Sequence, residues 1–270
     1  MRVALAQLEI EPGAVSENRD RAVAAVERAA DRGAEFVVLP ELFTVGYFAF
    51  DLYERHAEPL EGETVSRIRS VAEEHGVAVL AGSFVEDLGA TEGAETPAPE
   101  GLANTSVLLD GEGRRRLVYR KRNLFGYGSA EDELLVPGER LRTAEVGGHT
   151  VGVTTCYDLR FPEEFRRLAA AGATMVAVPS AWPYPRVEHW QVLSRARAIE
   201  NLFFLAAANG SASFPDATLL GRSAVYDPWG TPLASAGEDP ALVTAEADPG
   251  RVAAVRGEFP AWHDRFGRKD

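Results

Sequence analysis

The chain has 270 residues, of which 46% are apolar and 26% are charged, and its formal net charge is −13. A chain of this size and composition can bury one large core, so we expect a single domain over residues 1–270. The acidic balance repels a phosphate backbone and argues against nucleic acid as a partner. No run of about 18 apolar residues is present, so we expect no membrane span.

Cysteine usage and the first residues bear on the compartment. Cys156 is the only cysteine in the sequence, which excludes an internal disulfide. The stretch from Met1 to Glu9 lacks the long apolar segment and the cleavage site of a signal peptide. We therefore expect a cytoplasmic protein.

The chain opens with the pattern of a βαβ unit. Residues 3–8 are typical of a buried strand, and a helix is expected from Ser16, a possible cap, to Gly33. Residues 36–39 are wholly apolar and predict a second strand. Glu41 follows the second strand directly, so it lies where a buried strand ends. A βαβ crossover places the carboxyl ends of its two strands on the same side of the sheet.

The middle of the chain repeats this plan and then changes to a hairpin. A helix is expected near residues 64–75, with Gly76 as its stop, and residues 87–101 read as an exposed acidic loop. Lys121 lies just past the second strand of the hairpin. The strands of this part are expected over residues 77–85, 105–109 and 115–119.

The second half leads to Cys156 and continues with further strands. Two strands flank the Gly147-Gly148 turn, and the second of them ends just before Cys156, where the backbone turns towards a helix. Helices are expected over 162–171 and 187–201 and from Pro249, and strands over 174–178, 203–208, 223–226, 232–235 and 241–247. This balance of strand pairs and βαβ units predicts two stacked sheets with helices outside.

Two surface features carry expectations about partners. Residues 114–116 are all arginine and residues 120–122 are Arg-Lys-Arg, and we expect most of these cations to line a solvated strand, with one or two turned towards an anionic substrate. Alanine-rich helix faces, at Ala22–Ala30 and Leu168–Ala171, allow helix layers to approach closely across a two-fold axis. We therefore expect a homodimer or a larger even homo-oligomer.

Cys156 is a candidate nucleophile, although a lone cysteine commonly serves as a small buried hydrophobe. A cysteine attacks as the thiolate, so it needs a base or a cation beside it. The five histidines stand apart with no pairing at ligand spacing, so we expect no histidine triad and no zinc site. A carboxylate such as Glu41 can be the base if burial raises its pKa. A lysine ammonium can then stabilise the oxyanion that forms on attack.

Lys121 is unusual because only it and Lys269 are lysine among the 28 basic residues. Its place between two arginines favours a requirement for a compact ammonium that the planar guanidinium of arginine cannot replace. The alternatives are a chance lysine at a solvated strand end and, for Glu41, a helix cap or a salt-bridge partner.

Three segments together resemble the nitrilase, or carbon–nitrogen hydrolase, superfamily, and the resemblance covers nearly the whole chain. They are Leu39-Pro40-Glu41-Leu42-Phe43, Tyr119-Arg120-Lys121-Arg122-Asn123-Leu124-Phe125 and Cys156-Tyr157-Asp158-Leu159-Arg160-Phe161-Pro162-Glu163. Two later stretches, residues 189–201 and 221–223, agree with the family pattern. Asn123 departs from it, because histidine is frequent at that position. The resemblance implies a four-layer αββα sandwich, usually dimerised through helical faces.

The resemblance also implies the catalytic residues, namely a triad of Glu41, Lys121 and Cys156. It adds a second glutamate seven residues before a Pro-Gly glycine, which here is Glu131 before Gly138. The implied reaction is amide hydrolysis through a thioester on the cysteine, with no cofactor and no metal. A nitrile, a carbamoyl amine or an acyl transfer could use the same residues. A catalytically silent protein that binds small amides on this fold is an alternative of a different class.

The substrate-binding residues are expected beside the nucleophile and in the loop of residues 179–186. We expect the backbone N–H of Tyr157 to hold the oxyanion together with Lys121, and Trp182 to line the site. The cysteine segment resembles those of omega-amidases and deaminated-glutathione amidases, whose substrates are amides of dicarboxylic or keto acids. Arg160 can grip such a carboxylate in bidentate fashion, unless it pairs with Asp158 or Glu163 instead. The charges of Arg195, Arg197 and Glu200, on the expected helix 187–201, are expected to form structural ion pairs.

Overall fold

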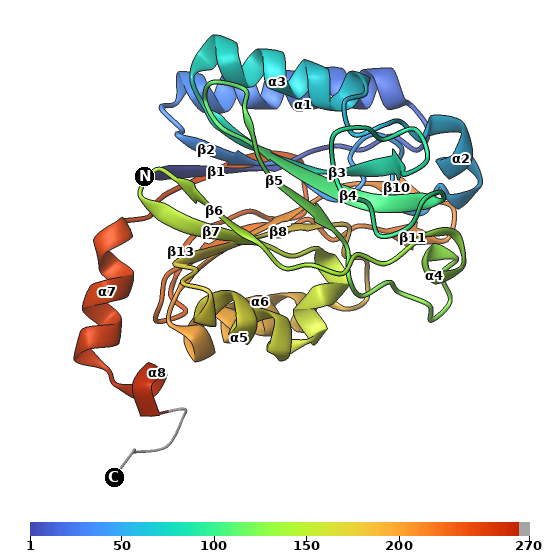
Figure 1. Cartoon of the computed structure of the whole chain (residues 1–270). Coiled ribbons are helices and arrows are strands. Elements are labelled where there is room, and N and C mark those ends of the chain that lie inside the picture. Colours follow the sequence, from blue (N-terminus) through green and yellow to red (C-terminus); the bar gives the residue numbers. More distant parts are fainter. Residues whose placement is uncertain (265–270) are drawn as a thin grey trace.

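The computed structural model describes residues 1–264 and contains two large β-sheets that lie face to face, with helices on both outer surfaces (Figure 1). The first sheet has the order β14 (Ala241–Glu246), β1 (Arg2–Gln7), β2 (Phe36–Val38), β3 (Ala78–Asp87), β4 (Leu102–Leu109) and β5 (Arg115–Arg120). The second has the order β13 (Pro232–Ser235), β12 (Ala224–Tyr226), β9 (Phe204–Asn209), β8 (Met175–Ser180), β7 (His149–Val153) and β6 (Thr143–Val146). The four-layer αββα sandwich implied by the sequence is therefore confirmed.

Each sheet has a parallel centre and antiparallel edges. In the first sheet β1, β2 and β3 run parallel, and in the second β7, β8 and β9 do. Helices α1 (Val15–Asp31) and α3 (Glu63–His75) cover the first sheet, and α5 (Pro162–Ala170) and α6 (Val187–Asn201) cover the second (Figure 1). The remaining helices are α2 (Tyr53–His56), α4 (Glu131–Leu134), α7 (Pro249–Glu258) and α8 (Ala261–Asp264), with 3₁₀ turns at Phe50–Leu52 and Cys156–Arg160. A small hairpin joins β10 (Ser213–Phe214) to β11 (Ala217–Thr218).

The alternation of side chains along the strands divides the core into layers. Val3 and Leu5 of β1 point into the space between the sheets, whereas Ala4 and Ala6 face the α1–α3 layer. In β8, Met175 belongs to the inner layer, and its neighbour Val176 faces the layer of α5 and α6. Because both faces of these strands are covered, their sequences are apolar without a break, as is typical of buried parallel strands.

The expected cap of the first helix is wrong. Ser16 is not the cap of α1, because the helix already begins at Val15. The buried side chain of Asn18 instead fixes the preceding loop, by donating to the carbonyl oxygens of Glu11 and Thr44 at 2.7 Å and accepting from the Glu11 N–H at 3.0 Å.

The alanine-rich faces are not free surfaces for a partner. Ala22, Ala25 and Ala29 are at most 2% exposed and pack in the layer between α1 and the first sheet. In α5, Leu168 and Ala169 are likewise buried against the second sheet. Small side chains here let a helix approach its own sheet, which a pattern of small residues cannot distinguish from approach to a second subunit. No helix within residues 1–264 has the length and apolar character needed to cross a bilayer.

Candidate active site

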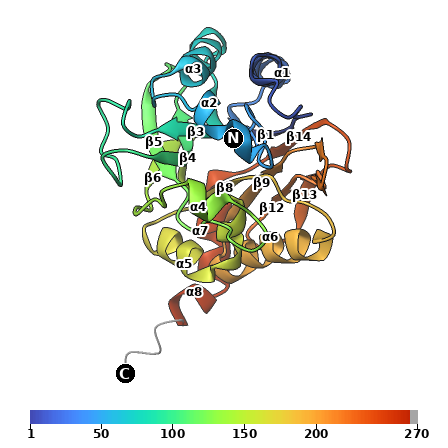
Figure 2. The same ribbon diagram turned by 90° about the vertical axis from the view of Figure 1, so that its right-hand side faces the viewer.

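The candidate residues gather where strands of both sheets end, on the side of the molecule that carries α4 (Figure 2). Glu41 follows β2, Lys121 follows β5, and Cys156 follows β7. Glu131 is the first residue of α4. The structure thus brings together the four residues to which the sequence assigns catalysis, from segments far apart in the chain.

Glu41 is held in place by a tight contact between its loop and β3. Leu42 has a φ of 43°, and its N–H donates to Ser83 Oγ at 2.8 Å. Gly82 makes this contact possible, since a Cβ there would lie 2.1 Å from the Leu39 carbonyl oxygen. The Glu41 carboxylate is fully buried and accepts a hydrogen bond from the Ala181 N–H at 2.8 Å. It is therefore anchored from the second sheet while its own backbone belongs to the first.

Lys121 lies between two carboxylates. Its Nζ is 2.8 Å from Glu41 Oε1 and 2.8 Å and 2.9 Å from the two carboxylate oxygens of Glu131, and its side chain is fully buried. The backbone is fixed as well, because the Lys121 N–H donates to the Asn104 carbonyl and the Gly138 N–H donates to the Lys121 carbonyl, both at 2.9 Å. A Cβ at Gly138 would lie 2.1 Å from the Arg120 carbonyl oxygen, so only glycine fits there.

Glu131, rather than its acidic neighbours, faces the lysine. Besides Lys121, its carboxylate accepts hydrogen bonds from Tyr47 Oη at 2.9 Å and from the Phe125 N–H at 2.8 Å. Asn104 Nδ2 bridges the two acids, at 2.9 Å from Glu41 Oε1 and 3.2 Å from Glu131 Oε1. Both carboxylates therefore have fixed orientations and several donors, which buried charges require.

Cys156 begins a 3₁₀ turn directly after the β7 end, with a φ of 47°. Asp158, two residues on, secures this turn: it accepts from the Thr155 N–H at 2.8 Å, from Tyr119 Oη at 2.5 Å and from Asn123 Nδ2 at 2.7 Å. The turn that carries the thiol is thereby tied to the segment that carries Lys121. Asn123, which departs from the family pattern, takes part in this link.

The charges around the thiol set the protonation states. Burial raises the pKa of Glu41 above its ordinary 4.5, Lys121 opposes this, and the negative charge of Glu131 adds to it. Burial would lower the pKa of Lys121, but Glu131 and Glu41 together hold it well above 10.5. Burial and the negative charge of Glu41 raise the pKa of the Cys156 thiol well above 9.0. These shifts favour a protonated thiol and a charged ammonium, and they make Glu41 a stronger base than an ordinary carboxylate.

Cys156 opens into a cavity of about 270 Å³. The expected substrate-binding residues Tyr157, Arg160 and Trp182 all line it, together with Lys121. The Arg160 guanidinium lies over the Trp182 ring at 5.1 Å and over the Tyr157 ring at 5.9 Å. Trp182 is fixed by a hydrogen bond from its Nε1 to the Arg186 carbonyl at 3.0 Å.

Arg160 does not pair with Asp158 or Glu163, the two alternative partners expected from the sequence. Asp158 is occupied by the hydrogen bonds described above, and the Arg160 side chain lies 3.1 Å from His189 Nδ1. Within residues 1–264, no carboxylate lies within ion-pair distance of Arg160. This guanidinium is therefore available to a ligand. Further along, Arg197 forms the expected ion pair with Glu200 at 2.8 Å and also donates to the Leu159 carbonyl.

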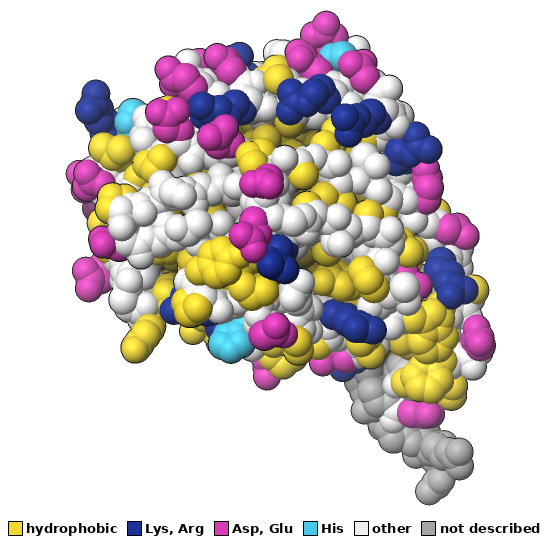
Figure 3. All heavy atoms as spheres, turned by 180° about the vertical axis from the view of Figure 1, so that it is seen from behind, with side chains coloured by type: hydrophobic (Ala, Val, Ile, Leu, Met, Phe, Trp, Pro, Cys, Tyr) yellow, Lys and Arg dark blue, Asp and Glu magenta, His cyan; other side chains and the backbone are white. Residues whose placement is uncertain are grey.

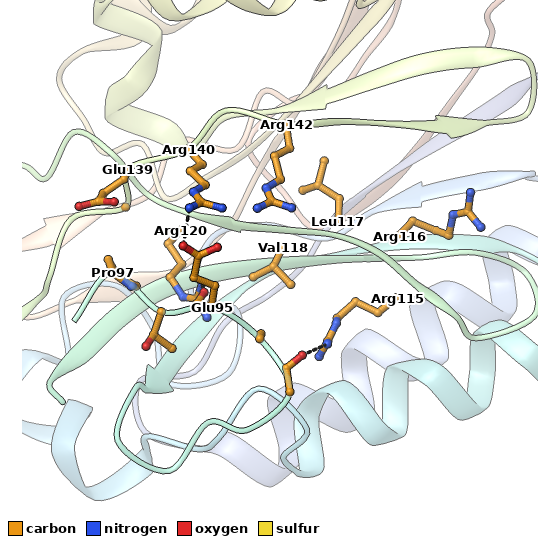
Figure 4. Close-up of a pocket in the computed structure, with 14 residues that line it drawn as sticks. Glu95, Pro97, Arg115, Arg116, Leu117, Val118, Arg120, Glu139, Arg140 and Arg142 are labelled. Carbon is orange, nitrogen blue, oxygen red and sulfur yellow. Dashed lines mark hydrogen bonds and ion pairs between the residues drawn. The ribbon is translucent and has the colours of Figure 1, made fainter. Parts of the chain in front are cut away.

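Of the six cations at residues 114–116 and 120–122, Lys121 is the one that lines this cavity, in line with the expectation that one or two of them face the site. Arg115, Arg116 and Arg120 line a separate hollow of about 300 Å³, which Arg140 and Arg142 also line (Figure 4). Arg120 is bound to the buried Glu86 at 2.6 Å and 2.7 Å. Strand alternation explains the result, because Arg120 and Lys121 are successive residues and point to different places.

Several site residues were not predicted from the sequence. Tyr47 and Asn104 donate to the carboxylates from a loop and from within β4, and Ala181 contributes only a backbone N–H. Arg186 and Asp216 also line the cavity, the latter from the β10–β11 turn. The Pro215-Asp216 pair is a turn signal that indicates this small hairpin, but nothing in it indicates a place at a cavity mouth.

The comparisons with known proteins agree with this geometry. The sequence model of the carbon–nitrogen hydrolase family matches residues 2–257. A 2-oxoglutaramate amidase of Bacillus subtilis is 36% identical over 259 residues, covering 96% of this chain and 95% of the relative. A 2-oxoglutaramate amidase of Paenarthrobacter nicotinovorans is 36% identical over 236 residues, with 86% and 78% covered.

Solved structures agree as well. Nit3 of Saccharomyces cerevisiae, a member of branch 10 of the nitrilase superfamily, has a TM-score of 0.86 and 30% identity, covering 98% of this chain and 96% of that one. An amidase from Nesterenkonia sp. AN1, solved with acrylamide added to its active-site cysteine, has a TM-score of 0.79 and 30% identity, with 98% and 99% covered. The chain therefore belongs to the carbon–nitrogen hydrolase family of the nitrilase superfamily and is a hydrolase that acts on carbon–nitrogen bonds.

Proposed function

We propose that the protein hydrolyses a small amide to a carboxylic acid and ammonia, with Cys156 as the nucleophile. The observation that carries this is that Cys156 and Lys121 line one cavity, while the buried Glu41 carboxylate is bound to Lys121 at 2.8 Å and to the backbone of the cavity-lining Ala181 at 2.8 Å. A thiol with a raised pKa needs a base at hydrogen-bond distance, and a carboxylate with a raised pKa is a competent one.

In the first half-reaction, Glu41 takes the thiol proton while the sulfur of Cys156 attacks the amide carbonyl carbon. The carbonyl oxygen becomes an oxyanion, which accepts hydrogen bonds from the Lys121 ammonium and the backbone N–H of Tyr157. When this intermediate collapses, Glu41 returns the proton to the nitrogen, the C–N bond breaks, and ammonia leaves. The product is an acyl thioester on Cys156.

In the second half-reaction, water replaces ammonia. Glu41 takes a proton from the water as its oxygen attacks the thioester carbon, and the same donors hold the second oxyanion. Collapse breaks the C–S bond, frees the carboxylic acid, and returns the proton to the sulfur of Cys156. Glu131 keeps Lys121 and Asn104 in place throughout, since its carboxylate is bound to both.

We propose that the amide carries a carboxylate, which Arg160 binds. The two bacterial relatives are both named 2-oxoglutaramate amidases, and Arg160, which has no ion-pair partner among residues 1–264, lies in the same cavity as Cys156. A planar guanidinium binds a carboxylate through two parallel hydrogen bonds. In a protein of net charge −13, such a local anchor offsets the repulsion of an anionic substrate.

A screen of ammonia release tests this function against its alternatives. Succinamate and 2-oxoglutaramate, propionamide, a nitrile and a carbamoyl amine would be compared at equal concentrations. Preference for the carboxylate-bearing amides supports the proposal, whereas preference for the nitrile or the carbamoyl compound selects those chemistries. Binding without any turnover would identify a silent binding protein. Arg160→Ala should lower activity on succinamate far more than on propionamide.

The remaining features of the protein are proposed on physical grounds. We propose one domain over residues 1–270, a cytoplasmic location, and no nucleic-acid partner because of the acidic charge. We also propose a homodimer, or a larger even assembly, formed through exposed apolar side chains. Val192 and Ile199 are 58% and 46% exposed on one face of α6, and Trp229, Leu233 and Phe259 are also exposed. Figure 3 shows apolar side chains gathered on the lower half of one face of the molecule.

A further inference from the structure

The cavity contains a second guanidinium that the proposed reaction does not use. Arg186 lines the cavity together with Cys156 and Arg160, and it is half-buried. Its carbonyl oxygen accepts hydrogen bonds from Trp182 Nε1 at 3.0 Å and from the Trp190 N–H at 3.1 Å. The backbone of Arg186 is thus fixed where α6 begins, partly by Trp182, which also lines the cavity.

The two guanidiniums flank a pair of aromatic rings. The rings of Phe125 and Tyr157 meet edge to face with centroids 4.9 Å apart. Arg186 lies over the Phe125 ring at 5.7 Å, and Arg160 lies over the Tyr157 ring at 5.9 Å. A guanidinium placed over a ring keeps its N–H donors, which lie in its own plane, free for a ligand.

Neither guanidinium has a countercharge within the part of the chain that the structure describes, since no carboxylate of residues 1–264 lies within ion-pair distance of either. Nearby arginines differ: Arg222 is 2.8 Å from Glu238, and Arg197 is 2.8 Å from Glu200. Among residues 1–264, the cavity lining includes a single acid, the exposed Asp216. Two guanidiniums at one cavity, neither with an ion-pair partner among the described residues, therefore indicate a ligand with more than one acceptor.

We propose that Arg186 is a second specificity residue, which binds an oxygen next to the carboxylate that Arg160 holds. This rests on the proposed function, and it narrows the substrate class to amides of acids with an oxo or hydroxyl group beside the carboxylate. A substrate with a simple aliphatic carboxylate would use one guanidinium and leave the other without an acceptor. An oxygen on the adjacent carbon is too close to share one guanidinium fork with a bidentate carboxylate, so it needs a donor of its own.

Glutaramate and 2-oxoglutaramate form a matched pair for the test, because they differ only in the oxo group. The parent should prefer 2-oxoglutaramate, with concentrations counted as the open-chain form. In Arg186→Ala, kcat/KM for 2-oxoglutaramate should fall about 10- to 100-fold, the scale of one hydrogen bond to a charged group, while glutaramate changes less than about threefold. Arg160→Ala should lower both substrates together. Arg142→Ala is the matched control, since this exposed arginine lines the separate hollow of Figure 4 and should change neither value.

Two results would overturn the assignment of Arg186. One is an equal loss on both substrates, which places the side chain on their shared carboxylate or on the fold. The other is no loss on either. If the parent hydrolyses neither amide, the proposed function fails separately, and calorimetric binding of the two compounds to Cys156→Ala still tests Arg186. In this binding assay, Cys156→Ala with Arg186 intact should bind 2-oxoglutaramate more tightly than glutaramate, and the double variant Cys156→Ala/Arg186→Ala should not.

Discussion

Replacement of Lys121 by arginine keeps the charge but should abolish most activity. The ammonium is fully buried and its Nζ contacts three carboxylate oxygens at 2.8–2.9 Å, with the Tyr47 ring centroid 5.2 Å away. A guanidinium is wider than an ammonium, and it cannot approach both glutamates and a developing oxyanion from one point. The expected loss of transition-state stabilisation is about 2.7–4 kcal/mol, the scale of one oxyanion donor, or about 100- to 1,000-fold in kcat.

The assay is steady-state ammonia release, with thermal unfolding measured on the same samples. Overpacking at this position should cost about 1–3 kcal/mol of folding free energy, so the variant should still fold. Arg120→Lys is the matched control, because it makes the reverse exchange one residue away, in the Glu86 ion pair. It should lose stability but keep kcat. Activity of Lys121→Arg within tenfold of the parent would show that Lys121 supplies only a diffuse positive field, and the oxyanion role would be wrong.

Three further predictions follow from the site and the surface. Cys156→Ala should fold with a loss of at most about 1–2 kcal/mol and release no ammonia; turnover near the parent rate would exclude Cys156 as the nucleophile. The kcat/KM of the parent should fall on the acid side of its pH profile, at a pH above 4.5, as Glu41 becomes protonated. Glu131→Gln should move this acid limb to lower pH, because the charge of Glu131 raises the pKa of Glu41. If the limb does not move, its pKa belongs to a group other than Glu41. Ile199→Lys should convert a dimer to a monomer by light scattering at micromolar concentration, and a parent that is already monomeric would refute the dimer.

The sequence was sufficient to predict the two-sheet architecture and the backbone positions of the main candidates. Glu41, Lys121 and Cys156 each follow a strongly apolar or alternating strand, so strand patterns place all three at strand ends. Glu41 and Lys121 follow strands of the first sheet and Cys156 follows a strand of the second, so the stacking of the two sheets is also needed to bring them together. The helix over residues 187–201 was predicted with the bounds that the structure has, since its pattern is flanked by a proline-rich loop and an apolar strand.

Other parts of the site depend on tertiary contacts that leave no local pattern. Asn104 lies just ahead of the strand predicted over residues 105–109, but the structure places it inside β4, where it bridges both glutamates. Arg186 reads as a surface charge ahead of a helix, and only the folded loop places it at the cavity. The alanines of α1 led to an incorrect expectation of a subunit contact. A face of small residues indicates close packing, but it does not distinguish the protein's own sheet from a second subunit.

The central claim is that amide cleavage passes through an acyl thioester on Cys156, and it can be measured directly. The enzyme would be mixed with succinamate, quenched in acid within milliseconds, and digested for peptide mass analysis, with a parallel reaction containing hydroxylamine. The account predicts that the peptide containing Cys156 gains the mass of succinamate less ammonia, and that hydroxylamine intercepts the thioester as a hydroxamate. Steady ammonia release with neither an adduct on Cys156 nor a hydroxamate would contradict it.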